Sequence, residues 1–338
     1  MGKSRLISSA VIALVGCTLV GYASPAFSAM TAPGTSAIAS LQQNVTFMPR
    51  ETRWLMVLNF NGAGGVSAQR NSFFAVTVEN RPGFRRMQQQ IQQTLGVNAT
   101  KQIRSLWAFG AAQGPRSGAF ILDTTVPAKT IIDKLGKNPA TSRDSYDGVN
   151  IFRVQNSFGP PQHRHASKLF LAVVDPGIVV GSMNEKLLER SLDAHLGIKK
   201  SLSLKSHLFD GRKSGQMFYF SLVHLQRAID AAQNPLNVPP QVRQIRAVHL
   251  MAVSGPKAVE MHGYLQMLSA KAANRSAAQL KLLKKMAYHA NTGANATDHQ
   301  MVLAGLIEHL KLSVKKDRVI IEWRMPYALL RHLAQRHR

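Results

Sequence analysis

Cysteine is almost absent from this 338-residue chain. The one cysteine, Cys17, lies in an apolar stretch near the N-terminus. The remainder of the chain therefore forms no intramolecular disulfide and carries no thiol nucleophile. Some 310 residues follow that stretch, which is enough for one large domain or two small ones with cores of their own.

Acidic residues are also scarce, with 17 Asp and Glu against 42 Lys and Arg. Without Lys3 and Arg5, which belong to the leader described below, the balance is 40 against 17, a net charge of +23. The 12 histidines add positive charge below about pH 6.5. Such a surface attracts anions, including lipid head groups, acidic envelope polymers and nucleic acid. A basic surface that serves solubility alone is the alternative interpretation.

Motifs of catalysis and nucleotide binding are missing as well. The sequence contains no G-x-G-x-x-G, no G-x-x-x-x-G-K-S/T, no H-E-x-x-H and no G-x-S-x-G. Two acidic pairs lie close in sequence, Asp144 with Asp147 and Glu185 with Glu189, but both are typical of a solvated surface.

A possible metal site is equally weak. His163 and His165 alternate as ligands on a strand would, yet no third ligand is near and a zinc site needs three or four. We predict no catalytic residue, no cofactor and no metal site.

The N-terminus resembles an export signal. Lys3 and Arg5 form a charged region, residues 6–20 form an apolar region, and small residues at Ala26 and Ser28 favour cleavage after Ser28. Two alternatives are a retained membrane anchor and a lipobox at residues 14–17, in which Cys17 would be lipidated. The predicted location is the periplasm or the cell exterior, with lipid anchoring through Cys17 as the alternative.

The stretch from Lys168 to His195 organises the fold. Residues 168–174 and 178–181 are apolar and β-branched, and Asp175-Pro176-Gly177 supplies the turn between them. A helix then starts, for which the S-x-x-E spacing of Ser182 and Glu185 predicts a capping box.

The coarse pattern divides the chain into five segments. We predict a signal peptide at 1–28, a flexible linker at 29–47, a first α+β half at 48–197, a basic linker at 198–215 and a second α+β half at 216–338.

The order strand, helix, hairpin, helix, hairpin, helix occurs in both halves, which indicates a tandem duplication. Hairpins join most strands, so the predicted class is α+β, with mainly antiparallel sheets and helices packed on one face.

A basic patch is the best candidate for a binding site. The predicted helix 272–289 carries its lysines on one side and leucines on another, and more cations follow at the C-terminus. Aromatic residues are not interleaved with these charges, which disfavours a platform for single-stranded nucleic acid. The candidate anion-binding residues are Lys281, Lys284, Lys285, Arg331 and Arg336. Cations late in a helix also stabilise its dipole, which is the alternative role.

Three stretches resemble a family of exported bacterial proteins of unknown function: MPRETRWLMVLNF from Met48, the Tyr146-Asp147-Gly148-Val149 motif before a strand, and LFLAVVDPGIVVGSMNEKLLERSL from Leu169. The resemblance implies an exported tandem α+β domain and assigns no catalytic residue. This chain departs from the usual members in being strongly basic.

The expected function is therefore a non-enzymatic envelope protein that binds or scaffolds, through its basic surface, an anionic envelope polymer or the lipid head groups of a membrane surface. Export disfavours nucleic acid as its partner, and the sequence predicts no particular oligomeric state. The alternative is a hydrolase whose site is assembled between the two halves.

Overall fold

The computed structural model describes residues 42–59, 82–111, 118–156, 167–174, 176–210, 216–225, 242–255 and 257–335. The chain divides into two compact units. The described residues of the central unit lie between 42 and 225, apart from 82–87. Those of the C-terminal unit are 82–87 and the described residues between 242 and 335.

The central unit is built on antiparallel strands in the order β8-β1-β2-β3-β7-β6-β5-β4. Their bounds are β1 Trp54–Asn59, β2 Ile103–Gly110, β3 Gly118–Thr124, β4 Thr141–Tyr146, β5 Val149–Asn156, β6 Ser167–Val174, β7 Ile178–Ser182 and β8 Gln216–Val223.

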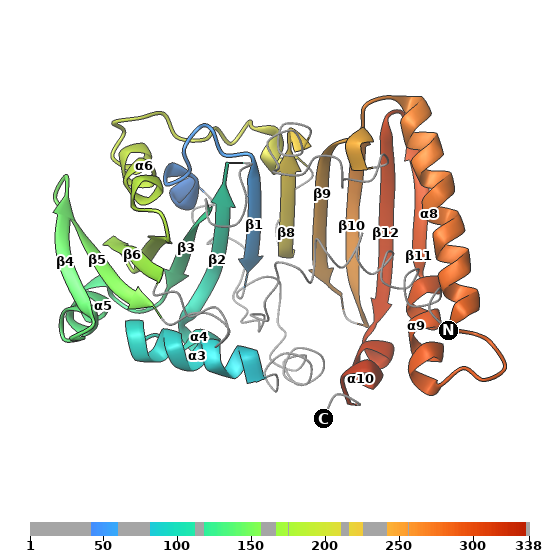
Figure 1. Ribbon diagram of the computed structural model, residues 1–338, viewed down its shortest axis with the longest axis horizontal. Helices are drawn as coiled ribbons and strands as arrows, with labels where there is room; N and C mark the ends of the chain where they lie inside the picture. Colours follow the sequence, from blue (N-terminus) through green and yellow to red (C-terminus); the bar gives the residue numbers. More distant parts are fainter. Residues whose placement is uncertain are drawn as a thin grey trace. The chain divides into compact units, whose positions relative to one another are not determined.

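Helices α5 and α6 pack against these strands (Figure 1). Ile131 and Leu135 of α5 and Leu188 and Leu192 of α6 are fully buried, so each helix contributes one apolar stripe to the core. The helices of this part of the chain are α3 Pro82–Leu95, α4 Ala99–Gln102, α5 Ala128–Gly136, α6 Glu185–His195 and the 3₁₀ helix η5 His207–Phe209.

The C-terminal unit has antiparallel strands in the order β11-β12-β10-β9. Helix α8 packs on β10, β11 and β12 (Figure 1), and a cluster of Val259, Leu306, Tyr327 and Leu330 joins the sheet to α9 and α10. The bounds are β9 Ile245–Ser254, β10 Ala258–Met267, β11 Leu310–Lys315, β12 Arg318–Pro326, α8 Ala270–Ala290, α9 Asp298–Glu308, α10 Tyr327–Gln335 and η7 Val242–Gln244.

The α+β class with antiparallel strands is confirmed, and the hairpin β6–β7 falls where the sequence predicts it. The tandem duplication is not confirmed. Strand β8, which the prediction placed at the start of the second half, pairs with β1 inside the central unit. The division between the units accordingly falls after Pro235, not at 198–215.

Both predicted linkers contain packed residues. Residues 42–46 are helical, and Val45 and Phe47 are buried, so the flexible segment 29–47 does not extend to its predicted end. In the second linker Leu202 and Leu208 are buried. A basic, Gly- and Ser-rich composition gave no sign of these apolar anchors.

The predicted capping box at Ser182 is wrong. Ser182 ends β7, and its hydroxyl donates to the carbonyl of Gly118 at 3.0 Å. Asn184 caps α6 instead, since its side chain accepts from the N–H of Leu187 at 3.3 Å. Glu185 forms an ion pair with Arg153 of β5 in place of the predicted contact with Ser182.

Candidate functional site

The outer face of α8 is the strongest candidate site. Ser269 caps the helix by accepting from the N–H of Ala272 at 3.1 Å. The buried positions are the alanines Ala273, Ala277 and Ala287, whose small side chains suit close packing on the sheet. The larger side chains of the helix are therefore distributed toward its flanks and its outer face.

That outer face is basic throughout. The 21-residue helix contains no acidic residue. Its exposed cations are Lys271, Arg275, Lys281 and Lys285, and we call these four the α8 cations. With no carboxylate on the same helix, their charge is not neutralised by neighbours one turn away.

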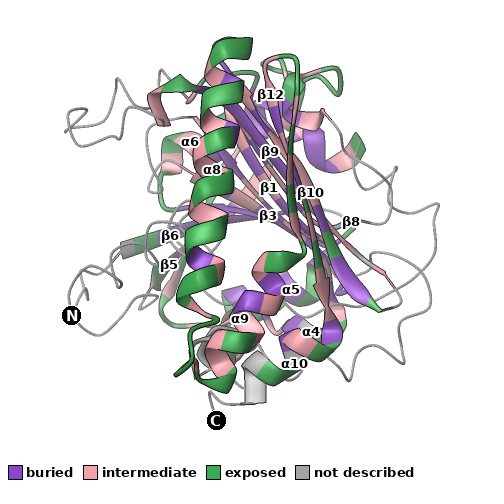
Figure 2. Ribbon diagram, turned by 90° about the vertical axis from the view of Figure 1, so that its right-hand side faces the viewer, coloured by how far each residue is buried: buried purple, intermediate pink, exposed green. Residues whose placement is uncertain are grey.

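Two large apolar side chains lie among these cations. Leu282 is 59% exposed and Met286 is 40% exposed, and their i, i+4 spacing places them on the same face as Lys285. Figure 2 shows the exposed outer surface of α8 along its length. Exposed leucine and methionine side by side, bordered by cations, make this face a candidate interaction surface.

Lys284 has a different role from the one predicted. Its ammonium donates to the carbonyl of Glu308 at 3.1 Å and to that of Leu310, at the junction of α9 and β11. The lysine therefore satisfies carbonyl groups at a helix end and fastens α8 to its neighbours. Of the predicted anion-binding residues, Lys281 and Lys285 remain in the site. The side chain of Arg331, on α10, and the residues Arg336 and Cys17 lie outside the described part.

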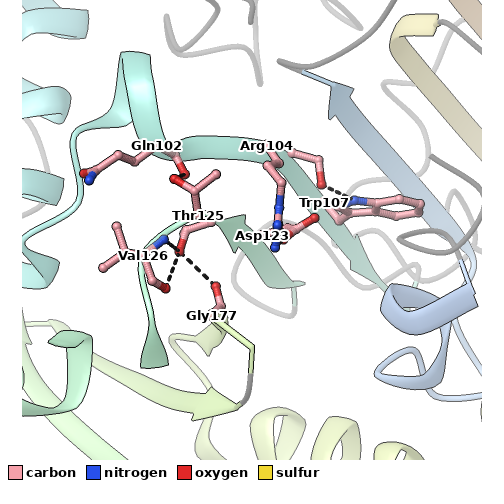
Figure 3. Close-up of polar contacts among 9 residues, drawn as sticks. Gln102, Arg104, Trp107, Asp123, Thr125, Val126 and Gly177 are labelled. Atoms are coloured by element: carbon pink, nitrogen blue, oxygen red, sulfur yellow. Dashed lines mark hydrogen bonds and ion pairs between the residues drawn. The ribbon is translucent and has the colours of Figure 1, made fainter. Parts of the chain in front are cut away.

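Several acids of the central unit form ion pairs. Arg104 donates from Nε and Nη2 to one oxygen of Asp123, at 2.9 and 2.6 Å (Figure 3). Asp123 is buried, and this burial raises the pKa of its carboxyl although Arg104 acts against the shift. Trp107 donates to the hydroxyl of Ser105 beside the pair at 2.9 Å.

A second polar group links β4 to the end of α6. The Tyr146 hydroxyl donates to Asp193 at 2.7 Å, and the Lys199 ammonium donates to the other oxygen of this buried carboxylate. Burial opposes ionisation of Asp193, but the hydrogen bonds from Lys199 and Tyr146 together lower its pKa. The hydrogen bond to Asp193 raises the pKa of Tyr146 to about 12.

Within the described ranges, Arg153 and His195 also join structural elements. Arg153 donates to Asp144 at 3.0 Å and to Glu185 at 2.8 Å, so one member of each acidic pair considered above is bound to the same arginine. His195 stacks on Phe47, and burial lowers the pKa of its imidazole. Each of these groups has a structural role in joining two elements.

The described residues contain no cluster of three or more His, Cys, Asp or Glu side chains able to hold a metal ion. His163 and His165 lie outside them. Among the helices of the described ranges, none has the length and apolar character needed to cross a bilayer.

Sequence reasoning missed the polar contacts because they join distant residues, such as Tyr146 to Asp193 and Arg104 to Asp123. It also missed Leu282 and Met286 as part of the site. The signal was present in their i, i+4 spacing beside Lys281 and Lys285, but exposed and core leucines look alike in a sequence.

Comparison with known proteins gives no family assignment. No protein-family model matches the chain, and no curated protein matches it. Among solved structures, crystal forms III, I and IV of TP0453 are similar, with TM-scores of 0.44, 0.43 and 0.45 and identities of 10%, 11% and 12%. The alignments cover 86%, 87% and 87% of this chain and 96%, 97% and 96% of TP0453. A likeness at this level assigns no function.

The Asp193 group predicts a pH-dependent loss of stability. Folding lowers the pKa of Asp193. The ionised carboxylate therefore stabilises the fold above the unfolded pKa of about 3.9, and this stabilisation is lost as the pH falls through the folded pKa. We expect Asp193→Asn to reduce the unfolding free energy by about 1 to 3 kcal/mol at pH 7. Urea unfolding at pH 7 and pH 3 should show the difference shrink in acid. Asp133→Asn, at an exposed position on α5, is the control.

Asp123 predicts the opposite trend with pH. Its folded pKa is raised, so the folded state binds this proton more tightly than the unfolded state, and wild type gains stability as the pH falls through the folded pKa. We expect the unfolding free energy of wild type to increase relative to that of Asp123→Asn as the pH falls from 7 to about 4 in the same urea series. A constant difference across this range would show that Arg104 cancels the effect of burial.

Proposed function

We propose that this protein is a non-enzymatic, exported envelope protein that binds an anionic bilayer surface through the outer face of α8. The observation that carries the proposal is the composition of that face, where Lys281 and Lys285 border exposed Leu282 and Met286, Lys271 and Arg275 lie further along the helix, and the helix contains no acid. The predicted export signal at 1–28 supports an envelope location. The hydrolase alternative stays a prediction.

The chemistry of the face favours lipid over a soluble anion. Lysine and arginine interact with anionic head groups, and each is worth about 1 kcal/mol near such a surface. An interfacial helix of this kind buries its apolar side chains at the boundary between head groups and acyl chains. Burial of Leu282 and Met286 in that environment is favourable, whereas a hydrated polymer offers no apolar layer in which to bury them.

The same charges disfavour a second copy of the chain as the occupant. Two α8 faces packed against one another would bring eight like charges together with no acid on either helix to neutralise them. Burying Leu282 and Met286 in a dimer would require the flanking lysines to be desolvated or displaced. An anionic bilayer satisfies the apolar and the charged side chains at once.

The α8 cations predict salt-dependent binding. We expect the full chain to co-sediment with phosphatidylglycerol vesicles at low salt, to be released as salt rises, and to bind pure phosphatidylcholine weakly. Replacing Lys271, Arg275, Lys281 and Lys285 with Gln should weaken binding at least about tenfold. The matched control replaces four exposed lysines of the central unit with Gln: Lys101, Lys129, Lys137 and Lys186. Equal losses in the two variants would mean that only net charge matters and would contradict the assignment to α8.

The apolar pair predicts a contribution that salt does not remove. We expect Leu282→Ser with Met286→Ser to weaken vesicle binding and to leave retention on soluble polyphosphate unchanged, because the polymer offers no apolar layer. Thermal unfolding should show little change, since both side chains are exposed. Unchanged vesicle binding would identify the ligand as an anionic polymer and overturn the choice of lipid.

A further inference from the structure

The central unit carries a second basic and apolar surface, the segment 196–207 that follows α6. Leu196 is 42% exposed, Ile198 57% and Leu204 43%. Three large aliphatic side chains thus face solvent within nine residues. Single exposed aliphatics are ordinary, but such a concentration on one short segment marks an interaction surface.

The segment is fixed by neighbouring structure, so these side chains are held outward. The N–H of Leu202 donates to the carbonyl of Met48 at 2.7 Å, and the N–H of Arg50 donates to the carbonyl of Lys200 at 3.3 Å. Ser201 forms a β-bridge with Pro49. Leu202 itself is buried, so the chain alternates between an anchor that packs inside and aliphatics that do not.

The charges of the segment match those of the α8 face. Lys199, Lys200 and Lys205 are exposed, and no acidic residue occurs between Leu196 and Phe209. Lys199 is bound to the buried carboxylate of Asp193, which ties the start of the segment to α6. The two lysines that remain, Lys200 and Lys205, flank Leu204.

We propose that the segment 196–207 is a second bilayer-contact element, which inserts Leu196, Ile198 and Leu204 at the head-group boundary of an anionic membrane. The proposal rests on the function proposed above for its choice of ligand, but not on α8. Charge complementarity selects the occupant, because the lysines need anions and the aliphatics need an apolar layer. A second copy of this segment would bring lysine against lysine.

The test uses a local probe, because net binding would not say which segment inserts. In the full chain with Cys17→Ser, single cysteines are introduced by Ile198→Cys, Leu204→Cys, Leu282→Cys and Thr130→Cys and labelled with nitrobenzoxadiazole. Thr130 is an exposed polar position on α5 and serves as the control. We expect the dye at 198 and 204 to brighten about twofold or more with phosphatidylglycerol vesicles and to stay unchanged at 130.

The outcomes separate the two proposals. A response at 282 with none at 198 and 204 overturns this inference and leaves the function of α8 standing. A response at 198 and 204 with none at 282 supports the segment and overturns α8 as the binding face. No change in fluorescence at 198, 204 or 282 overturns both proposals. A response at 198 and 204 to soluble polyphosphate equal to that with vesicles overturns lipid as the occupant.

Discussion

The close packing of α8 on its sheet through alanine is the constraint on which the proposed surface depends. Ala273, Ala277 and Ala287 are the buried residues of the helix. Small side chains suit close approach of the helix to the strands, and Leu282 and Met286 are exposed. The core of the C-terminal unit is completed elsewhere, where Val259, Leu306 and Tyr327 meet. The outer side chains of α8 therefore contribute little to the core.

The distribution of acids explains why the surface stays basic. In the central unit, Asp123 and Asp193 are buried and ion-paired, and Glu185 is bound to Arg153. A buried carboxylate requires such a partner, because an unpaired charge is costly in the interior. These pairs neutralise only a few cations, because the chain has 42 Lys and Arg against 17 Asp and Glu. The net charge of the sequence therefore appears on the outside, concentrated on acid-free stretches such as α8 and 196–207.

The sequence predicted elements well and their assembly less well. Continuous apolar runs located β6 and β7, and a helical pattern located α8, within two residues, because burial imposes these patterns directly. It missed β4, whose residues between Thr141 and Tyr146 are mostly exposed and so carry no apolar alternation. It also misassigned Lys284, since helical spacing places a lysine on a flank but does not reveal that the carbonyls of Glu308 and Leu310 lie there.

A surface made basic for solubility alone would explain the exposed lysines. It would not explain the exposed aliphatic side chains near them. Solvation selects polar side chains at exposed positions, whereas Leu282 on α8 and Ile198 after α6 are each more than half exposed. Leu282 lies on a capped helix, and Ile198 lies on a segment in which Lys200 and Leu202 are hydrogen-bonded to Arg50 and Met48. The same pairing of fixed aliphatics with unneutralised lysines occurs in two units of different topology, and a bilayer surface is the environment that suits both kinds of side chain.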